Sequence, residues 1–268
     1  MCDVLYKVRG RAGPALSVIV VLDTNLWISA VFVGDGGVMP GKMRGALERI
    51  LSSVGRVSRR PLKCPKSDDV AASDLRPEIE CVYRSLGGIL RSVPHFKLRP
   101  WDIEFDGIAV ELDESLHFNR YRGVTLGSAS YASLPCFPFG AYQRFCSEHE
   151  DICLKNGGYG GKWSNTSCER QFGEASQPGV LPEKVTEMEH GAPRWKQRAF
   201  YDFVKDLSPM LIGVKVVRIA VWEETGGADG KTTVGETLDA AVRTSAHARS
   251  ASPAAQVLAA LIRKRAAD

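Results

Sequence analysis

The dipeptide Asp106-Gly107 constrains the fold of this chain more than any other feature. A type I′ turn needs positive φ at both central positions, which Asp tolerates and Gly adopts freely. The turn therefore predicts a β-hairpin in which residues equally far from it face each other across two strands. The predicted pairs are Phe105 with Ile108, Glu104 with Ala109, Ile103 with Val110, Asp102 with Glu111, and Trp101 with Leu112.

The two faces of this predicted hairpin differ in character, because side chains alternate along a strand. One face is apolar, and the other carries Asp102, Glu104, Glu111 and Asp113. Facing carboxylates repel one another, but a divalent cation between them turns that repulsion into attraction. Mg²⁺ and Mn²⁺ prefer oxygen ligands and can activate water against a phosphodiester. The alternative is a water-facing sheet surface on which the acids are only solvated.

The segment from Asp102 through Glu111 and Asp113 to His117 resembles the core of PD-(D/E)XK-type endonucleases, in particular the very-short-patch repair branch. In that branch, an Asp on one strand is followed by Glu-x-Asp on the next strand and then by a His. The resemblance covers residues 73–223. It implies an α/β, restriction-endonuclease-like core in which a helix, three strands, a helix and a strand follow one another. It also implies metal-dependent endonuclease activity on phosphodiester bonds in DNA.

The resemblance assigns roles to the residues of the acidic hairpin. Asp102, Glu111 and Asp113 would supply ligands for Mg²⁺ or Mn²⁺. His117 would act as a base or as a further metal ligand. In the alternative interpretation, His117 makes only a structural hydrogen bond.

Positive charge has to reach this site from elsewhere, because Asp113 stands where the commonest motif of the family has a Lys. Lys196 and Arg198 open the helix expected before the last strand, and the resemblance makes them candidates to stabilise the developing negative charge. Arg120 and Arg122, shortly after the hairpin, have guanidinium groups that suit bidentate phosphate binding.

The remaining elements define three regions around the hairpin. A nuclease-like domain is expected over residues 73–224, with a helix from residue 73 that ends before Pro94 and a strand over 214–223. Glu78 and Glu80 in that helix would assist the site or only stabilise the first helical turn. Residues 1–72 are expected to hold a strand and a linker with a short helix over 42–53. Residues 225–268 are expected to form a flexible tail with one short helix.

A second, local resemblance lies near the N-terminus. Residues 17–22 form a β-branched run that predicts a buried strand, and Asp23 follows it. Residues 18–29 resemble the first strand of PIN-domain ribonucleases, in which an Asp at this position is a metal ligand. A PIN-type ribonuclease centred on Asp23 and a non-catalytic nucleic-acid-binding protein are therefore the two alternative functions. A buried strand followed by a polar turn is the structural alternative.

Residues 123–194 predict an irregular insertion that is rich in Gly, Pro, Cys and aromatic residues. Thiolate ligands suit tetrahedral Zn²⁺, so a structural zinc site is one hypothesis for Cys136, Cys146, Cys153 and Cys168. Their spacing contains no Cys-x-x-Cys, and free, partly buried thiols are the alternative.

Composition sets only broad limits on these hypotheses. The chain has 268 residues, 44% of them hydrophobic, and a formal net charge of +4, so no strong basic field requires a nucleic-acid partner. Seven cysteines at irregular spacing do not match the disulfide framework of a small secreted domain, which favours a cytoplasmic protein. No uncharged run reaches the ~20 residues that a membrane span needs. The oligomeric state does not follow from the sequence.

Overall fold

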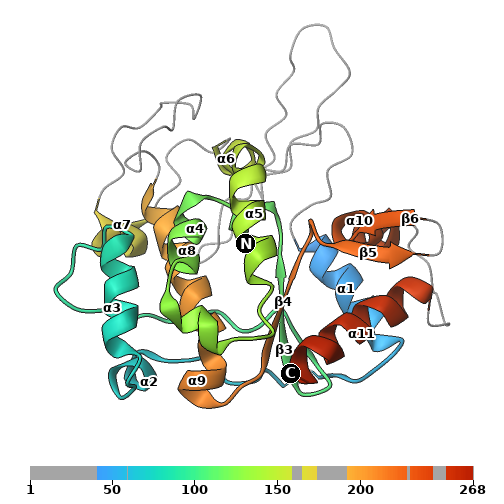
Figure 1. Cartoon of the computed structure of the whole chain (residues 1–268), viewed down its shortest axis with the longest axis horizontal. Coiled ribbons are helices and arrows are strands. Elements are labelled where there is room, and N and C mark those ends of the chain that lie inside the picture. The colour runs from blue at the N-terminus through green and yellow to red at the C-terminus, as the bar shows by residue number, and fades with distance from the viewer. Residues whose placement is uncertain are drawn as a thin grey trace, which may run out of the picture.

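The computed structural model describes residues 41–58, 60–158, 165–173, 192–227, 230–243 and 252–267. Within them, the chain is a mixed α/β protein with a small sheet between two groups of helices (Figure 1). The strand predicted over residues 17–22 and the PIN-like Asp23 lie outside the described residues.

The central sheet has four strands in the order β1-β2-β3-β4. They are β1 (Val57–Ser58), β2 (Ile103–Phe105), β3 (Ile108–Asp113) and β4 (Val216–Ala220). Strand β2 pairs antiparallel with both β1 and β3, whereas β4 runs parallel to β3. A separate two-stranded ribbon consists of β5 (Glu224–Gly227) and β6 (Gly230–Thr233).

The predicted hairpin register is confirmed for its three inner pairs, Phe105 with Ile108, Glu104 with Ala109 and Ile103 with Val110. Asp106 and Gly107 have φ values of 50° and 81°, as a turn with two left-handed positions requires. The two outer predicted pairs lie beyond the end of β2 and are not part of the ladder.

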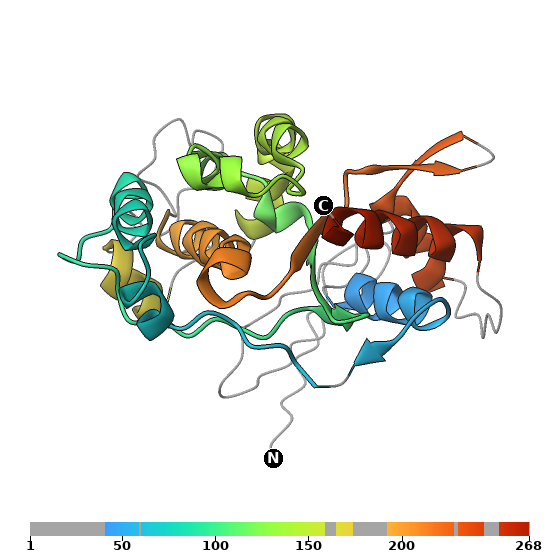
Figure 2. The ribbon, with the colours of Figure 1, turned by 60° about the horizontal axis from the view of Figure 1, so that its bottom comes forward.

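The apolar face of the hairpin is covered by helices from both ends of the described chain (Figure 2). These helices are α1 (Lys42–Ser52), α10 (Val234–Arg243) and α11 (Pro253–Ala267). Leu47 and Leu51 of α1 and Leu258 and Ile262 of α11 are fully buried in one core with Phe105. The short helix predicted over 42–53 is confirmed as α1.

Residues of the predicted linker and flexible tail therefore form part of the folded core. Their sequences lack long periodic runs, but an apolar sheet face must be covered, and these segments supply the cover. The described part of the tail comprises the β5-β6 ribbon, α10 and α11 in place of a single short helix.

The opposite face of the sheet packs against a larger group of helices, with α8 (Ala192–Asp206) at its centre. The others in this half are α2 (Ser67–Ala71), α3 (Arg76–Ser85), α4 (Arg120–Leu126), α5 (Phe139–Glu148), α6 (Glu150–Gly158), α7 (Thr166–Phe172) and α9 (Ser208–Ile212). Two 3-10 turns, η1 (Ser115–His117) and η2 (Ala129–Ser133), connect them. No helix in the described ranges is both long and apolar enough to cross a membrane.

The prediction of an irregular insertion over 123–194 was wrong for the residues that the structure describes there. They form most of α4, then η2, α5, α6 and α7, and the beginning of α8. These helices before α8 are short, so sequence periodicity hardly develops within any one of them. Caps and aromatic contacts define them instead: Asn119 caps α4, Asn165 caps α7, and Phe118 packs on Tyr142 with ring centroids 5.4 Å apart.

Candidate metal centre

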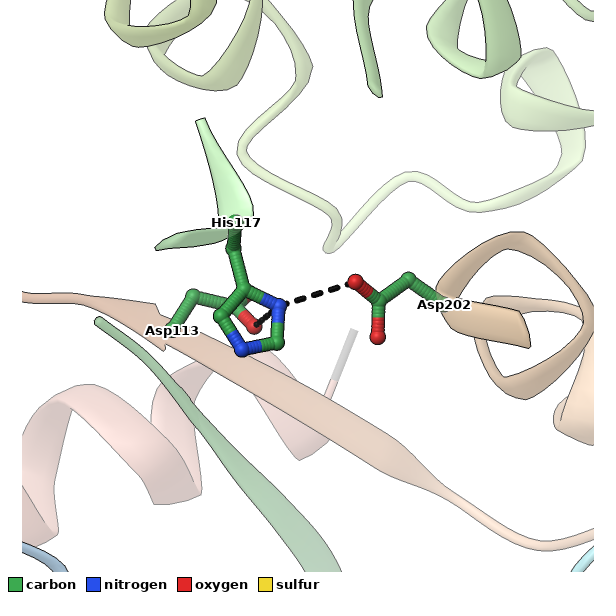
Figure 3. Close-up of side chains that lie close together, drawn as sticks. All are labelled: Asp113, His117 and Asp202. Carbon is green, nitrogen blue, oxygen red and sulfur yellow. Dashed lines mark hydrogen bonds and ion pairs between the residues drawn. The ribbon is translucent and has the colours of Figure 1, made fainter. Parts of the chain in front are cut away.

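Three side chains from separate elements meet at the C-terminal end of β3 (Figure 3). Asp113 ends β3, His117 ends η1, and Asp202 projects from α8. Nδ1 of His117 lies 2.8 Å from Oδ2 of Asp202 and 3.1 Å from Oδ1 of Asp113. One potential ligand atom from each residue lies within 4.8 Å of the others. Among the described residues, this is the only group of three or more acidic, His or Cys side chains that could hold a metal ion.

Local backbone geometry explains how Asp113 and His117 come together. Glu114 continues the strand direction with extended backbone angles, and the 3-10 turn η1 then folds the chain back. The imidazole returns to the carboxylate four residues earlier, and only 17% of its side chain is exposed. Asp113 and His117, which the sequence placed in one site, therefore lie side by side in the structure.

A buried arginine fixes both carboxylates of this triad from behind. Nη1 of Arg218, on β4, lies 2.6 Å from Oδ1 of Asp113, and its Nη2 lies 3.3 Å from Oδ1 of Asp202. Burial by itself would raise the pKa of Asp202, but His117 and then Arg218 hold this pKa well below its usual range. Asp202 is thus an ionised carboxylate in the folded protein.

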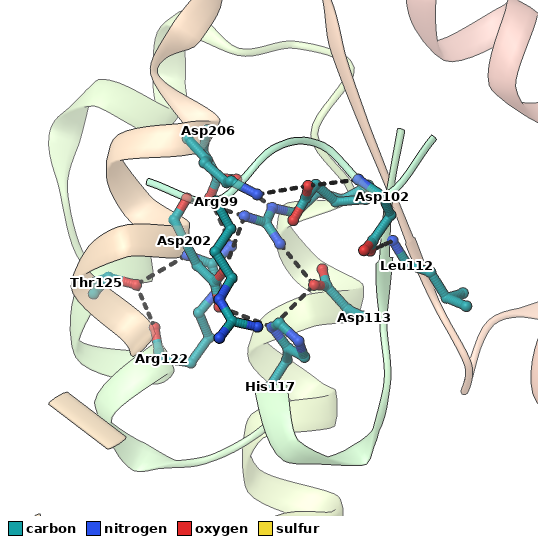
Figure 4. Close-up of polar contacts among 12 residues, drawn as sticks. Arg99, Asp102, Leu112, Asp113, His117, Arg122, Thr125, Asp202 and Asp206 are labelled. Carbon is teal, nitrogen blue, oxygen red and sulfur yellow. Dashed lines mark hydrogen bonds and ion pairs between the residues drawn. The ribbon is translucent and has the colours of Figure 1, made fainter. Parts of the chain in front are cut away.

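The polar contacts continue along α8 to a second arginine (Figure 4). Nη2 of Arg122 lies 2.6 Å from Oδ2 of Asp206, and the hydroxyl of Tyr131 donates to the same oxygen at 2.5 Å. Nε of Arg218 also donates to Asp206. Arg122 is therefore a buried structural partner of Asp206. The prediction from the sequence that Arg122 binds phosphate is wrong.

The charges of this buried cluster do not cancel. It contains three carboxylates and two guanidinium groups: Asp113, Asp202, Asp206, Arg122 and Arg218. One negative charge remains while the imidazole of His117 is neutral, and an uncompensated buried charge is costly. A proton on His117 or a cation held by the triad would compensate this charge. The donor set and its charge therefore fit a divalent metal ion.

The other two predicted Mg²⁺ ligands have different partners. Oε1 of Glu111 lies 2.7 Å from Nζ of Lys205 on α8, while Oδ2 of Asp102 accepts a hydrogen bond from the backbone N–H of Leu112 at 3.0 Å. Burial raises the pKa of Glu111 to about 7, against the opposing effect of the Lys205 charge. Of the three predicted ligands, only Asp113 belongs to the triad.

The two predicted cations of α8 point to different neighbours. Nζ of Lys196 lies 5.9 Å from the centroid of the Tyr121 ring, on the side of α4. Burial raises the pKa of Glu114, and the charge of Arg198 lowers it, with a smaller effect than those of His117 and Asp102. Lys205, rather than Lys196, is the lysine beside Glu111.

Three other candidates from the sequence make structural contacts. Glu78 accepts hydrogen bonds from the hydroxyl of Ser128 and from the backbone of Ala129, which joins α3 to η2. Glu80 pairs with Arg76 on the surface of α3. Arg120 forms a two-pronged ion pair with Glu150, which joins α4 to α6.

The four cysteines proposed as zinc ligands do not converge among the described residues. Burial raises the pKa of Cys146 to about 11 and that of Cys153 to about 12, so both remain neutral thiols. The thiol of Cys168 contacts Asn165 at the start of α7. The zinc hypothesis is therefore wrong for this part of the chain, and the alternative of free, mostly buried thiols describes it.

Sequence reasoning missed Asp202, Asp206, Lys205 and Arg218 as parts of the site. A signal for them exists: Arg218 interrupts an apolar strand, and Asp202 and Asp206 adjoin the apolar stripe of α8 at a spacing of four residues. Charged residues in such positions need buried partners of opposite charge. Which residues are paired, however, depends on how α8 lies across the sheet.

Searches with this chain found no significant match among curated proteins and none among solved structures. One family model matches residues 81–240, and its description is "Family of unknown function (DUF7255)". The matched range includes the whole triad and Arg218 but neither α1 nor α11. Because the match covers more than half of the chain, the protein belongs to this family of unknown function, DUF7255.

Proposed function

We propose that this protein is a metal-dependent nuclease that hydrolyses phosphodiester bonds in DNA. The observation that carries the proposal is the convergence of Asp113, His117 and Asp202, with ligand atoms within 4.8 Å of one another. Two carboxylates and one imidazole suit Mn²⁺ well, and Mg²⁺ accepts the same carboxylates. While the imidazole of His117 is neutral, the buried cluster carries one excess negative charge, which favours a cation at this position.

Each residue of the centre would have a distinct role. Asp113 and Asp202 would hold the cation, with Nδ1 of His117 as the third donor. Arg218 would keep both carboxylates in position, because it already contacts each of them. A bound divalent cation would polarise a phosphoryl oxygen and lower the pKa of bound water.

Two further features support a relation to the PD-(D/E)XK fold. Helix α3, strands β2 and β3, helix α8 and strand β4 follow one another as in the order that the resemblance implies, but two strands instead of three lie between α3 and α8, because β1 precedes α3. Lys205 lies 2.7 Å from Glu111 and would supply the positive charge of the Lys that the motif lacks. Lys205 lies on helix α8, whereas the Lys of the common motif lies on the same strand as the acids.

Cleavage of plasmid DNA and of single-stranded RNA in Mn²⁺ or Mg²⁺ tests this proposal. Asp202→Asn should reduce DNA cleavage by about 100-fold, because it removes an anionic ligand. Glu48→Gln is the matched control, since this exposed acid lies on α1, beyond the opposite face of the sheet.

Asp23→Ala separates the alternatives. RNA cleavage that Asp23→Ala abolishes and Asp202→Asn leaves intact would replace this proposal with a PIN-type ribonuclease. Nucleic-acid binding without cleavage of either substrate in either metal would indicate a non-catalytic binding protein.

A further inference from the structure

One side of α8 carries charged residues at every fourth position: Arg194, Arg198, Asp202 and Asp206. Residues four apart on a helix are neighbours on its surface. The two acids belong to the buried cluster at the metal centre. The two arginines continue the same stripe toward the start of α8, so positive charge adjoins the triad directly.

A third arginine comes from the segment before β2. Figure 4 includes Arg99 among the polar residues around Asp202 and His117. Burial and then the charge of Arg198 lower the pKa of Arg99. The pKa of Arg194 is lowered to about 10, chiefly by burial. The charge of Arg198 adds to this effect, and that of Arg99 adds less. The three guanidinium groups are therefore close enough to repel one another.

We propose that Arg99, Arg194 and Arg198 form an anion site that holds a phosphate group of the substrate beside the metal centre. A guanidinium group matches the geometry of a phosphate and binds it through two hydrogen bonds. A bound phosphate would also relieve the mutual repulsion of the three cations. The sequence already made Arg198 a candidate to stabilise developing negative charge, and the anion site adds phosphate binding to that role. Arg99 and Arg194 had no predicted role in the sequence.

This inference rests on the proposed function and narrows the substrate class. The triad would act on one phosphodiester, and the arginine site would hold a neighbouring phosphate of the same strand. The substrate is then a polynucleotide with at least two successive phosphates. A mononucleotide has one phosphate, so it could contact either the triad or the arginine site but not both.

Binding of inorganic phosphate tests the anion site without metal and without catalysis. Isothermal titration calorimetry of the full chain in metal-free buffer of low ionic strength would give the affinity. Arg194→Gln, Arg198→Gln and Arg99→Gln should each weaken phosphate binding by at least about tenfold, since each removes a charge-assisted contact. Arg44→Gln is the control, because this exposed arginine lies on α1, in the helix group that covers the other face of the sheet.

A conservative variant distinguishes loss of the phosphate contact from unfolding as the cause of weaker phosphate binding. Arg198→Lys keeps the charge but lacks the planar fork, so it should bind phosphate more weakly than wild type and more tightly than Arg198→Gln. Equal affinity in wild type and all three Gln variants would overturn the proposal. So would an equal loss in Arg44→Gln, which would indicate diffuse attraction to the whole protein.

Mn²⁺ binding, measured separately, distinguishes failure of this inference from failure of the proposed function. If Mn²⁺ binds the wild type, Asp202→Asn abolishes that binding, and phosphate affinity is unaffected by the arginine variants, the metal centre stands and the anion site fails. If phosphate binding depends on the three arginines but no Mn²⁺ binds, the anion site stands and the nuclease proposal fails.

Discussion

Oδ2 of Asp202 lies 2.8 Å from Nδ1 of His117, although 85 residues separate them in the chain. This contact joins α8 to the turn after β3 and creates the triad. It also means that a metal ion at Nδ1 has to replace the proton that the imidazole would otherwise share with the carboxylates. Metal and proton therefore compete for the same atom.

The affinity for Mn²⁺ should consequently fall as the pH falls, because protons compete with the metal for the ligand atoms of the triad. Electron paramagnetic resonance of free Mn²⁺ at pH 5.5, 6.5 and 7.5 measures this dependence. His117→Gln should bind Mn²⁺ weakly and with a smaller dependence on pH. A wild-type affinity that stays constant over this range would contradict a role for Nδ1 as a ligand.

Arg218→Met should lower the free energy of unfolding by about 3–5 kcal/mol, because it leaves Asp113, Asp202 and Asp206 buried without their shared cation. Urea denaturation followed by circular dichroism measures the change. Arg144→Met is the control: its ion pair with Glu148 spans 3.8 Å on the surface, and its loss should cost less than about 1 kcal/mol. Similar small losses in both variants would show that Arg218 does not hold the cluster together.

Glu111 should make stability depend on pH in an unusual direction. Its pKa rises from 4.5 to about 7 on folding, chiefly through burial, so between these values the native state binds more protons than the unfolded state. Its contribution to the free energy of unfolding therefore decreases by about 3 kcal/mol as the pH rises through this window.

Chemical denaturation of wild type and Glu111→Gln at pH 5 and pH 7.5 isolates this effect. The variant cannot titrate at position 111, so the stability difference between the two pH values should shrink toward that of the other groups. Glu48→Gln should retain the wild-type difference. An unchanged difference in Glu111→Gln would mean that Glu111 keeps its ordinary pKa in the folded protein.

Leu258→Ala should destabilise the protein by about 3 kcal/mol, since it opens a cavity where α11 packs on the apolar face of the sheet. Urea denaturation would measure this value against Ile89→Ala, whose side chain is 60% exposed and should contribute far less. A negligible effect of Leu258→Ala would restore the prediction of a flexible tail.

The sequence by itself determined the hairpin and the register of its three inner pairs. Asp106 and Gly107 favour positive φ through their own covalent structure, and alternation then assigns each neighbouring residue to a face. These effects act over a few residues, so they can be recognised without knowledge of the fold. The proximity of Asp113 to His117 is similarly local, because only one extended residue and one 3-10 turn separate them.

Only the tertiary structure decided which charges meet at the site. Arg218 contacts Asp113 across 105 residues, and Lys205 contacts Glu111 across 94, because β4 pairs in parallel with β3 and α8 crosses the polar face of the sheet. No local pattern specifies such pairs, since each residue alone suits several partners. Burial between sheet and helices selects among them, because an ionised group removed from water requires a compensating charge at close range.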